Sequence, residues 1–476
     1  MSDYQSCHAF SDDVLGDFDA TELAQQIKQG HISAQEVAAA AINRVKQVNE
    51  VINAVEAEQF ETARQQAATQ QEGFFAGVPT FIKDNVDLVG HPTNHGSAAV
   101  TSKPKKKHDP YVKQYLSQGF NVLGKSTLSE FGFNASCEPT HKPVTKNPWN
   151  TDYSTGASSA GSAALVAAGA VPIAHANDGG GSIRIPAACC GLVGLKPSRG
   201  RHVFNHQASQ LPIKIVSDGV VTRSVRDTAR FHAEAEKYYR NNKLPEIGLV
   251  EGASDRKLRI GFVIDSIAGT ATDQDTRETL LDTIKLLEGM GHEVFAVDIP
   301  VEKSFIEDFS LYWSMLAFSV HRAGKLAVDP SFNKRNVDGL SAGLSNLFAK
   351  NFYKAPAFMY RLNKLYRDYD QFFKNQQLDV LLTPVLSQTT FKLGHISPDI
   401  EFDELFQRLM GYVGFTPVAN ASGGPAISLP MGATDNNLPI SMMFSSNHGD
   451  ERTLLELAYA IEAEQPWRQI HKTPNS

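Results

Sequence analysis

Cysteine is scarce in this chain: four occur in 476 residues. Cys7, Cys137, Cys189 and Cys190 show no spacing typical of metal ligands, and the adjacent pair cannot easily close on itself. We therefore expect reduced thiols, no disulfide and no metal site.

Long apolar runs and an excess of positive charge are also absent. No stretch approaches the roughly 18 apolar residues of a membrane-spanning helix, so no membrane association is expected. Residues 1–23 are acidic and have neither the basic nor the apolar region of a secretory signal, which predicts a cytoplasmic protein. The formal net charge of -7 argues against nucleic-acid binding, and the one basic run, 103–108, is interpreted as a solvated loop.

Neither a fixed-period repeat nor a linker rich in proline, glycine or serine divides the sequence. Helical patterns alternate with buried strand patterns along most of the chain, which is typical of α/β proteins. We expect one large domain, 1–476, with a central mixed β-sheet covered by helices on both faces. The segment 303–376 is helical in pattern and rich in aromatic residues, and is expected to be a helical elaboration of that domain.

Local signals place the main elements. Thr21 is expected to open the first helix, and Ser33 with Glu36 forms a capping box that opens the second. The stretch 77–89 predicts a buried strand and a turn, with Lys83 at or near the strand end. Further strands are expected at 120–125, 258–265, 292–300 and 378–385, and helices at 110–118, from 127–132 onward and at 273–291.

Two serines lie 24 residues apart in small-residue surroundings. Ser158 precedes an alanine-rich helical stretch, and Ser182 follows Gly179, Gly180 and Gly181. Three glycines leave backbone N–H groups unshielded beside a hydroxyl, as an oxyanion requires. Lys83, 75 residues before Ser158, has apolar neighbours, and burial would lower its pKa and make it a usable base. A lysine and two serines can form a proton relay without a histidine.

Each of these features also has a purely structural interpretation. The glycines can form a turn that lets two backbones approach, and the small residues can pack a core helix. Lys83 can be ion-paired with Asp84 or Asp87. His95 and His175 are left open as bases.

Several common catalytic motifs are missing or misplaced. The GxSxG elbow of α/β-hydrolases is absent, because Ala160 and Arg184 stand two residues after the two serines. An SxxK match at 102–105 lacks the companion motifs SDN and KTG. A phosphate-loop pattern, GxxxxGKS, occurs at 119–126, but a helical pattern precedes it and its intervening residues look like a strand, so nucleotide binding is not expected.

Three blocks, GVPTFIKDN, NPWN with GASSAGSAA, and NDGGGSIRIPAACCGLVGLKPSRGR, occur in an order that resembles the amidase signature family. Stretches at 221–229, 378–385 and 415–430 are similar to later blocks of the family. The segment 303–376 has no recognisable counterpart and corresponds to the family's variable part.

The resemblance implies roles for individual residues. Ser182 would be the nucleophile, Ser158 the bridging serine on a cis peptide bond after Ala157, and Lys83 the base. Backbone N–H groups in the segment of Gly179, Gly180 and Gly181 up to the nucleophile would hold the oxyanion. The implied reaction is hydrolysis of a small-molecule carboxylic amide, at a C–N bond other than a peptide bond, through an acyl-enzyme and without a metal or organic cofactor.

The substrate and the assembly are less constrained. Gly179 replaces a frequent threonine or isoleucine, and in this form the block looks most like the branch that includes 6-aminohexanoate cyclic-dimer hydrolases. The A subunit of a glutamine-hydrolysing, tRNA-dependent amidotransferase, an amide-binding protein without turnover, and a homodimer are left open. Aromatic candidates for an acyl pocket, which more often belong to a core, are Trp313, Phe318, Phe352 and Tyr353.

Overall fold

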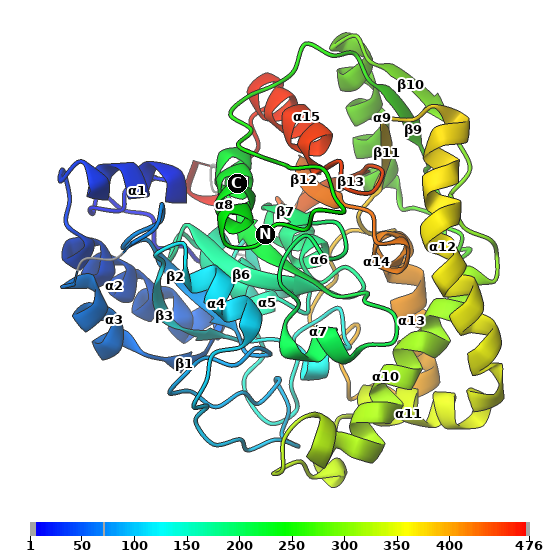
Figure 1. Cartoon of the computed structure of the whole chain (residues 1–476), viewed down its shortest axis with the longest axis horizontal. Coiled ribbons are helices and arrows are strands. Elements are labelled where there is room, and N and C mark those ends of the chain that lie inside the picture. Colours follow the sequence, from blue (N-terminus) through cyan, green and yellow to red (C-terminus); the bar gives the residue numbers. More distant parts are fainter. Residues whose placement is uncertain (1–5, 70–71, 473–476) are drawn as a thin grey trace.

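The computed structural model of the chain describes residues 6–69 and 72–472 (Figure 1). Its strands are β1 Val55–Glu58, β2 Pro79–Lys83, β3 Asn121–Ser126, β4 Lys146–Asn147, β5 Asn150–Ser154, β6 Ile173–Asp178, β7 Val193–Lys196, β8 Ser217–Thr222, β9 Arg259–Phe262, β10 Glu293–Ala296, β11 Val380–Pro384, β12 Ala426–Ala433 and β13 Pro439–Ser445.

The α-helices alternate with these strands over much of the chain. They are α1 Ala20–Lys28, α2 Ala34–Ile52, α3 Phe60–Ala67, α4 Pro110–Leu116, α5 Ala160–Ala167, α6 Arg184–Cys190, α7 His206–Gln210, α8 Val225–Tyr238, α9 Gln274–Gly289, α10 Phe305–Ala327, α11 Gly339–Asn351, α12 Ala355–Gln376, α13 Phe402–Tyr412, α14 Pro417–Ser422 and α15 Glu451–Glu464. Short 3-10 turns are η1 Glu130–Gly132, η2 Lys334–Asn336, η3 Phe352–Lys354 and η4 Ile470–Lys472.

The central sheet has eight strands in the order β10-β9-β11-β13-β12-β7-β8-β6. The pairs β10–β9 and β9–β11 are parallel, and the remaining neighbours are antiparallel, so the expected mixed sheet is confirmed. A smaller sheet, β1-β3-β2, places β2 against β6. Because β2 ends at Lys83 and β6 ends at Asp178, this packing brings the two candidate blocks together.

Helices cover both faces of the central sheet, as expected. Strand β11 shows how the pleat divides its side chains between the two faces. Leu381 joins a core cluster with α10, α12 and α13, whereas Val380 and Leu382 join a second cluster with α8, α9 and α15. Alternate residues of a strand point to opposite faces, so a run of apolar residues is buried on both sides.

Helix α5 lies at the centre of the molecule. Every residue of its sequence AGSAALVA is buried, and a helix that is apolar on all sides belongs in a core. The helix contacts β2, β3, β6, β8 and α6. Its small side chains allow these close approaches, and its N-terminus therefore fixes the position of the Ser158 segment.

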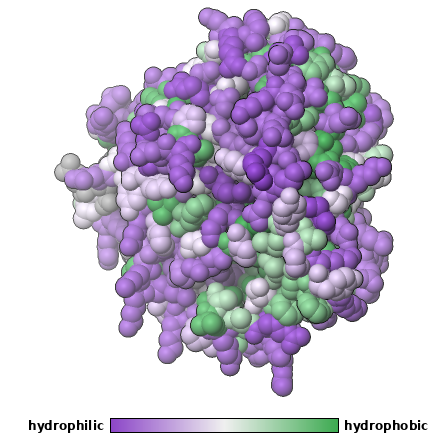
Figure 2. Space-filling model, turned by 45° about the vertical axis from the view of Figure 1, so that its right-hand side comes forward, coloured by the Kyte–Doolittle hydropathy of each residue, from purple (hydrophilic) through white to green (hydrophobic). Residues whose placement is uncertain are grey.

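The segment 303–376 forms three helices, α10, α11 and α12, which run along the right side of Figure 1. That this segment varies between relatives stays a prediction. The molecular face in Figure 2 is mostly hydrophilic, with apolar side chains in its lower part and along its upper right edge. In the described chain, no helix combines the length and apolarity needed to cross a bilayer.

Most of the elements predicted from local sequence signals are present, but the first residue of one helix and the existence of another were predicted wrongly. The capping box of Ser33 and Glu36 is confirmed. The first helix begins at Ala20, because the side chain of Asp19 caps it, and not at Thr21. The helix expected from 127–132 onward is wrong: only the turn η1 forms, since the φ values of 49° at Phe131 and 75° at Gly132 end any helical path.

Candidate active site

Three segments meet at the ends of β2 and β6. Lys83 is the last residue of β2, Ser158 lies two residues before α5, and Ser182 lies between β6 and α6. The Lys83 Nζ atom donates a hydrogen bond of 2.7 Å to Ser158 Oγ. The Ala157–Ser158 peptide bond is cis, as the resemblance implied. The structure thus brings together a lysine and a serine that are 75 residues apart in sequence.

Lys83 is buried among polar groups. Its side chain is fully buried, and Nζ also donates to Asn177 Oδ1 at 2.7 Å. The amides of Asn177 and Asn85 exchange two hydrogen bonds of 3.1 Å, which fixes the orientation of the Asn177 oxygen. Burial lowers the pKa of Lys83 to about 7, although the carboxylates of Asp218 and Asp178 oppose this shift. An amine with this pKa exchanges a proton readily near neutral pH.

The ion-pair partners proposed for Lys83 are engaged elsewhere. Asp84 pairs with the buried Lys125, and Asp87 lies 3.7 Å from Lys105. The alternative, purely structural interpretation, in which Asp84 or Asp87 is the ion-pair partner of Lys83, is therefore wrong. Lys125 also donates to Pro92 O and Thr93 Oγ1, each at 2.9 Å. It sits within β3 and is fully buried, so the phosphate-loop pattern at 119–126 offers no exposed lysine to a nucleotide.

A buried ion pair shapes the loop that carries Ser182. Arg184 Nε donates to Asp178 Oδ2 and Arg184 Nη2 to Asp178 Oδ1, both at 2.9 Å. Burial would raise the pKa of Asp178, but the guanidinium of Arg184 lowers that pKa well below its usual range. The same carboxylate accepts the N–H groups of Gly181 at 2.7 Å and Ile183 at 3.2 Å. One charged pair therefore folds the chain around Ser182.

The N–H groups of this loop are not equally available. Gly181 donates to Asp178, whereas no acceptor among the described residues takes the N–H of Gly179, Gly180 or Ser182. The carbonyl groups are fixed, since Thr416 Oγ1 donates to Gly180 O at 2.7 Å and Ser159 Oγ to Ser182 O at 2.6 Å. A Cβ atom at Gly179 would lie 3.1 Å from Val216 Cγ2, so a branched side chain there would press on Val216.

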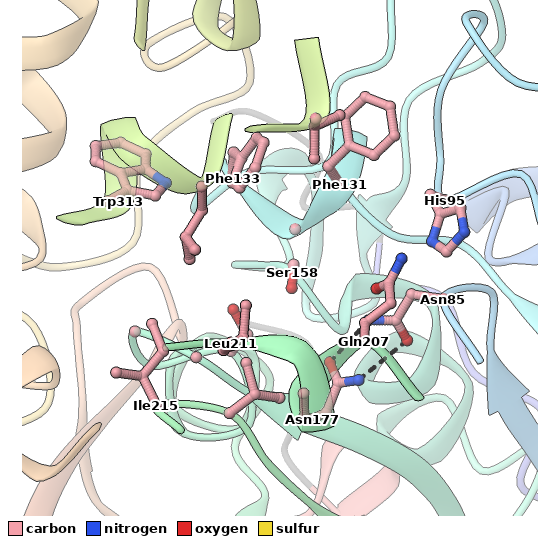
Figure 3. A pocket seen from close by; sticks show the side chains of 18 of the residues that line it. Asn85, His95, Phe131, Phe133, Ser158, Asn177, Gln207, Leu211, Ile215 and Trp313 are labelled. Carbon is pink, nitrogen blue, oxygen red and sulfur yellow. Dashed lines mark hydrogen bonds between the residues drawn. The ribbon is translucent and has the colours of Figure 1, made fainter. Parts of the chain in front are cut away.

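Both serines open onto one cavity of about 720 Å³. This volume is within the range of about 300–1,000 Å³ typical of small-molecule sites. Figure 3 shows Phe133, Leu211, Ile215 and Trp313 on one side of Ser158, and Asn85, His95 and Gln207 on the other. Among the described residues that line the cavity there is no aspartate, glutamate, lysine or arginine. The hydroxyls of Ser158 and Ser182 share this cavity, but no hydrogen bond joins them within the described chain.

The two histidines left open as bases occupy different positions. His175 is buried outside the cavity; its Nδ1 accepts the Lys83 backbone N–H at 3.2 Å, and its Nε2 lies 3.2 Å from Asp218 Oδ1. His95 lines the cavity. Burial, with Lys125 and Lys105 nearby, lowers the pKa of His95 to about 3, so it is neutral at physiological pH. Neither imidazole hydrogen-bonds to a candidate serine among the described residues.

The four aromatic candidates for an acyl pocket also occupy different environments. Trp313 lines the cavity from α10. Phe318 packs against Phe348, with ring centroids 5.2 Å apart. Phe352 and Tyr353 are each 66% exposed. Helical spacing in the sequence could not tell which of these residues lines the cavity.

Several residues of the site were missed by reasoning from the sequence. Asn85 and Asn177 stand close to Lys83 and Asp178 in the same sequence blocks. Amide side chains next to a candidate lysine could have indicated hydrogen-bond partners for it. Gly132 lines the cavity at a position where a Cβ atom would be 3.1 Å from Ser158 Oγ. Gln207 comes from the short helix α7 and carried no motif.

The four cysteines are free thiols, and the described chain holds no group of three or more histidine, cysteine, aspartate or glutamate side chains suited to a metal ion.

Comparison with known proteins gives consistent matches along the chain. A family model described as Amidase matches residues 36–455. The protein named "Putative amidase AmiC" from Mycobacterium leprae is 46% identical over 467 residues, covering 98% of this chain and 99% of that protein. The 6-aminohexanoate-cyclic-dimer hydrolase of Paenarthrobacter ureafaciens is 31% identical, covering 94% and 95%. A solved structure of 6-aminohexanoate cyclic dimer hydrolase complexed with substrate has a TM-score of 0.83 at 28% identity, covering 96% of this chain and 98% of that one.

Proposed function

The chain belongs to the amidase signature family of hydrolases that act on C–N bonds other than peptide bonds, and we propose that it hydrolyses an uncharged carboxylic amide through an acyl-enzyme on Ser182. The observation that carries the proposal is the hydrogen bond of 2.7 Å between Lys83 Nζ and Ser158 Oγ, at the wall of a cavity that Ser182 shares.

In the first half of the reaction, neutral Lys83 is the base. Nζ takes the Ser158 hydroxyl proton while Ser158 Oγ takes the proton of Ser182. Ser182 Oγ then attacks the amide carbon. The N–H groups of Gly179, Gly180 and Ser182 receive the developing oxyanion. The N–H of Gly181 is committed to Asp178, so its part is to hold the loop in shape.

Collapse of the tetrahedral intermediate breaks the C–N bond. Ser158 gives a proton to the leaving nitrogen and is reprotonated by Lys83, so the amine departs neutral and the acyl group remains on Ser182 Oγ. Water then attacks the ester and loses a proton to Ser158, which passes its own proton to Lys83. The acid leaves, Ser182 regains its proton, and Lys83 is neutral again. The proton balance closes on residues of this chain without a cofactor.

The absence of charged side chains from the described lining favours an uncharged substrate. A buried charge without a partner costs several kcal/mol, roughly, relative to water. Free glutamine carries an ammonium and a carboxylate, so this cavity does not complement it. This observation counts against the A subunit of an amidotransferase. The relative named for hydrolysis of 6-aminohexanoate cyclic dimer makes a neutral cyclic amide a first choice for testing.

The test is release of amine from a panel of aliphatic, aryl and cyclic amides. We expect Ser182→Ala to abolish hydrolysis, by roughly 10⁴-fold or more, with an unchanged melting temperature. Lys83→Ala is expected to cost orders of magnitude in rate. An amide-binding protein without turnover would retain substrate affinity and release no amine even as the wild type.

A matched control separates chemistry from packing. Ser162 lies four residues after Ser158, inside α5; it is also buried, and its hydroxyl donates to His175 O at 2.6 Å. Ser158→Ala should remove most activity, whereas Ser162→Ala should keep it. Near-wild-type activity in Ser182→Ala or Lys83→Ala would contradict the relay.

A further inference from the structure

At one end of the cavity, polar side chains that the reaction itself does not use lie beside the ring of Phe131. Figure 3 shows the Gln207 side chain reaching from α7 to the same side of Ser158 as His95 and Asn85. The Asn85 amide is occupied by its two hydrogen bonds with Asn177. By contrast, neither the Gln207 side chain nor the His95 ring, which stacks on Phe131, forms a hydrogen bond with another described residue. Two polar groups in the cavity are thus free to meet a ligand.

These two side chains can recognise only certain chemistry. The Gln207 amide offers N–H donors and a carbonyl acceptor, and neither carries charge. His95 is neutral because burial and the nearby lysines lower its pKa. A neutral imidazole offers one donor and one acceptor. A carboxylate or ammonium placed here would lose its hydration without gaining a counter-charge, whereas a carbonyl, amide or hydroxyl could pair with both side chains.

The opposite side of Ser158 is apolar. Leu211 and Ile215 follow α7, and Trp313 faces them from α10. A ligand that spans the serines would therefore place an apolar part against this wall and a different part at Gln207. The difference between the two ends of the cavity therefore favours one orientation of the bound ligand.

We propose that Gln207 and His95 form a recognition site for a second, uncharged hydrogen-bonding group of the substrate, which makes this enzyme selective for amides that carry such a group at a distance from the scissile bond. The inference rests on the proposed function, because it concerns substrates of the same site. Gln207 is a specificity-determining residue and takes no part in bond cleavage.

The experiment uses linear amides that share one scissile bond and one alkyl chain of fixed length. The chain ends in a carboxamide, a methyl group, a carboxylate or an ammonium group, and it lies on the acyl side in one series and on the amine side in the other. For the full-length wild type we expect, in one series, kcat/KM to be about five- to tenfold higher for the carboxamide than for the methyl compound. The carboxylate should be the poorest substrate.

Gln207→Leu should abolish the preference for the carboxamide while leaving kcat/KM for the methyl compound equal or higher. Gln207→Glu should raise the relative kcat/KM of a chain that ends in an ammonium group. The control is Ser209→Ala on the same helix: Ser209 is exposed and its hydroxyl donates to His206 O at 2.6 Å, so the wild-type preference should persist.

The outcomes separate the two proposals. An equal loss for all chain ends in Gln207→Leu, or a preserved carboxamide preference, would overturn the recognition site while amide hydrolysis stands. If the wild type hydrolyses no member of either series or of the wider amide panel, the proposed function itself fails.

Discussion

Gly132 tests the geometry of the relay most directly. Its φ of +75° lies in the left-handed region, and a Cβ atom at this position would be 3.1 Å from Ser158 Oγ and 3.6 Å from Ser158 Cβ. The same Oγ accepts a hydrogen bond of 2.7 Å from Lys83 Nζ. Gly132→Ala therefore pushes on the serine that connects Lys83 to the cavity.

The expected cost has two separate parts. An alanine in a left-handed conformation loses about 1–2 kcal/mol of folding free energy. The contact of 3.1 Å must also open by a few tenths of an ångström, roughly, which Ser158 can achieve only by shifting or by rotating away from Lys83. Since a misplacement of about 1 Å can cost 100-fold in rate, we expect kcat/KM to fall about ten- to 100-fold.

Gly30 provides the matched control. Its φ is +74°, and nothing lies within 4 Å of a Cβ atom built on it. Gly30→Ala should lose a similar amount of stability in thermal unfolding and keep full activity in the amine-release assay. Wild-type activity in Gly132→Ala, or the same loss of activity in both variants, would refute the reasoning.

Three further predictions follow from buried charges. The kcat/KM should fall as the pH drops below about 7, because Lys83 gains a proton and can no longer act as a base; Asp218→Asn removes a negative charge that favours protonated Lys83, so the midpoint of the pH profile should move to lower pH, and an unchanged or higher midpoint would contradict the assignment. Arg184→Met leaves the Asp178 carboxylate buried without its partner and should cost about 3–5 kcal/mol in urea unfolding; a loss below about 1 kcal/mol would show that Arg184 does not organise the loop. Lys125→Met leaves the Asp84 carboxylate buried without its partner and should lower the free energy of unfolding by a comparable amount. Calorimetry should detect no ATP binding to the wild type. Nucleotide binding that depends on Lys125 would favour the phosphate-loop interpretation.

Some parts of the site could be predicted because their signals are local. The block around Lys83 reads as a buried strand, and the structure ends β2 at that residue. The small residues after Ser158 predict a helix that others can approach closely, and α5 is such a helix. The glycines before Ser182 predict a loop with accessible N–H groups. That Lys83, Ser158 and Ser182 are the catalytic residues stays a prediction.

The remaining parts depend on contacts between distant segments. Gly181 looks like an oxyanion donor in sequence, but the carboxylate of Asp178 takes its N–H. Asp84 is the nearest carboxylate to Lys83 in sequence, yet it lies in the turn after β2 and its side chain pairs with the buried Lys125. The Gln207 and Trp313 walls of the cavity come from α7 and α10, more than 100 residues apart. Such pairings follow from tertiary packing, which no short window of sequence encodes.

The uncharged cavity also has a consequence for what happens after bond cleavage. If a neutral amide enters, as we propose, its hydrolysis at physiological pH yields an acid and an amine that both ionise in water. The cavity offers neither product a counter-charge, so each is better solvated outside than inside. On this proposal, hydration favours product release, and inhibition by accumulated acid or amine should be weak. The same uncharged lining would therefore favour binding of the substrate over binding of the products.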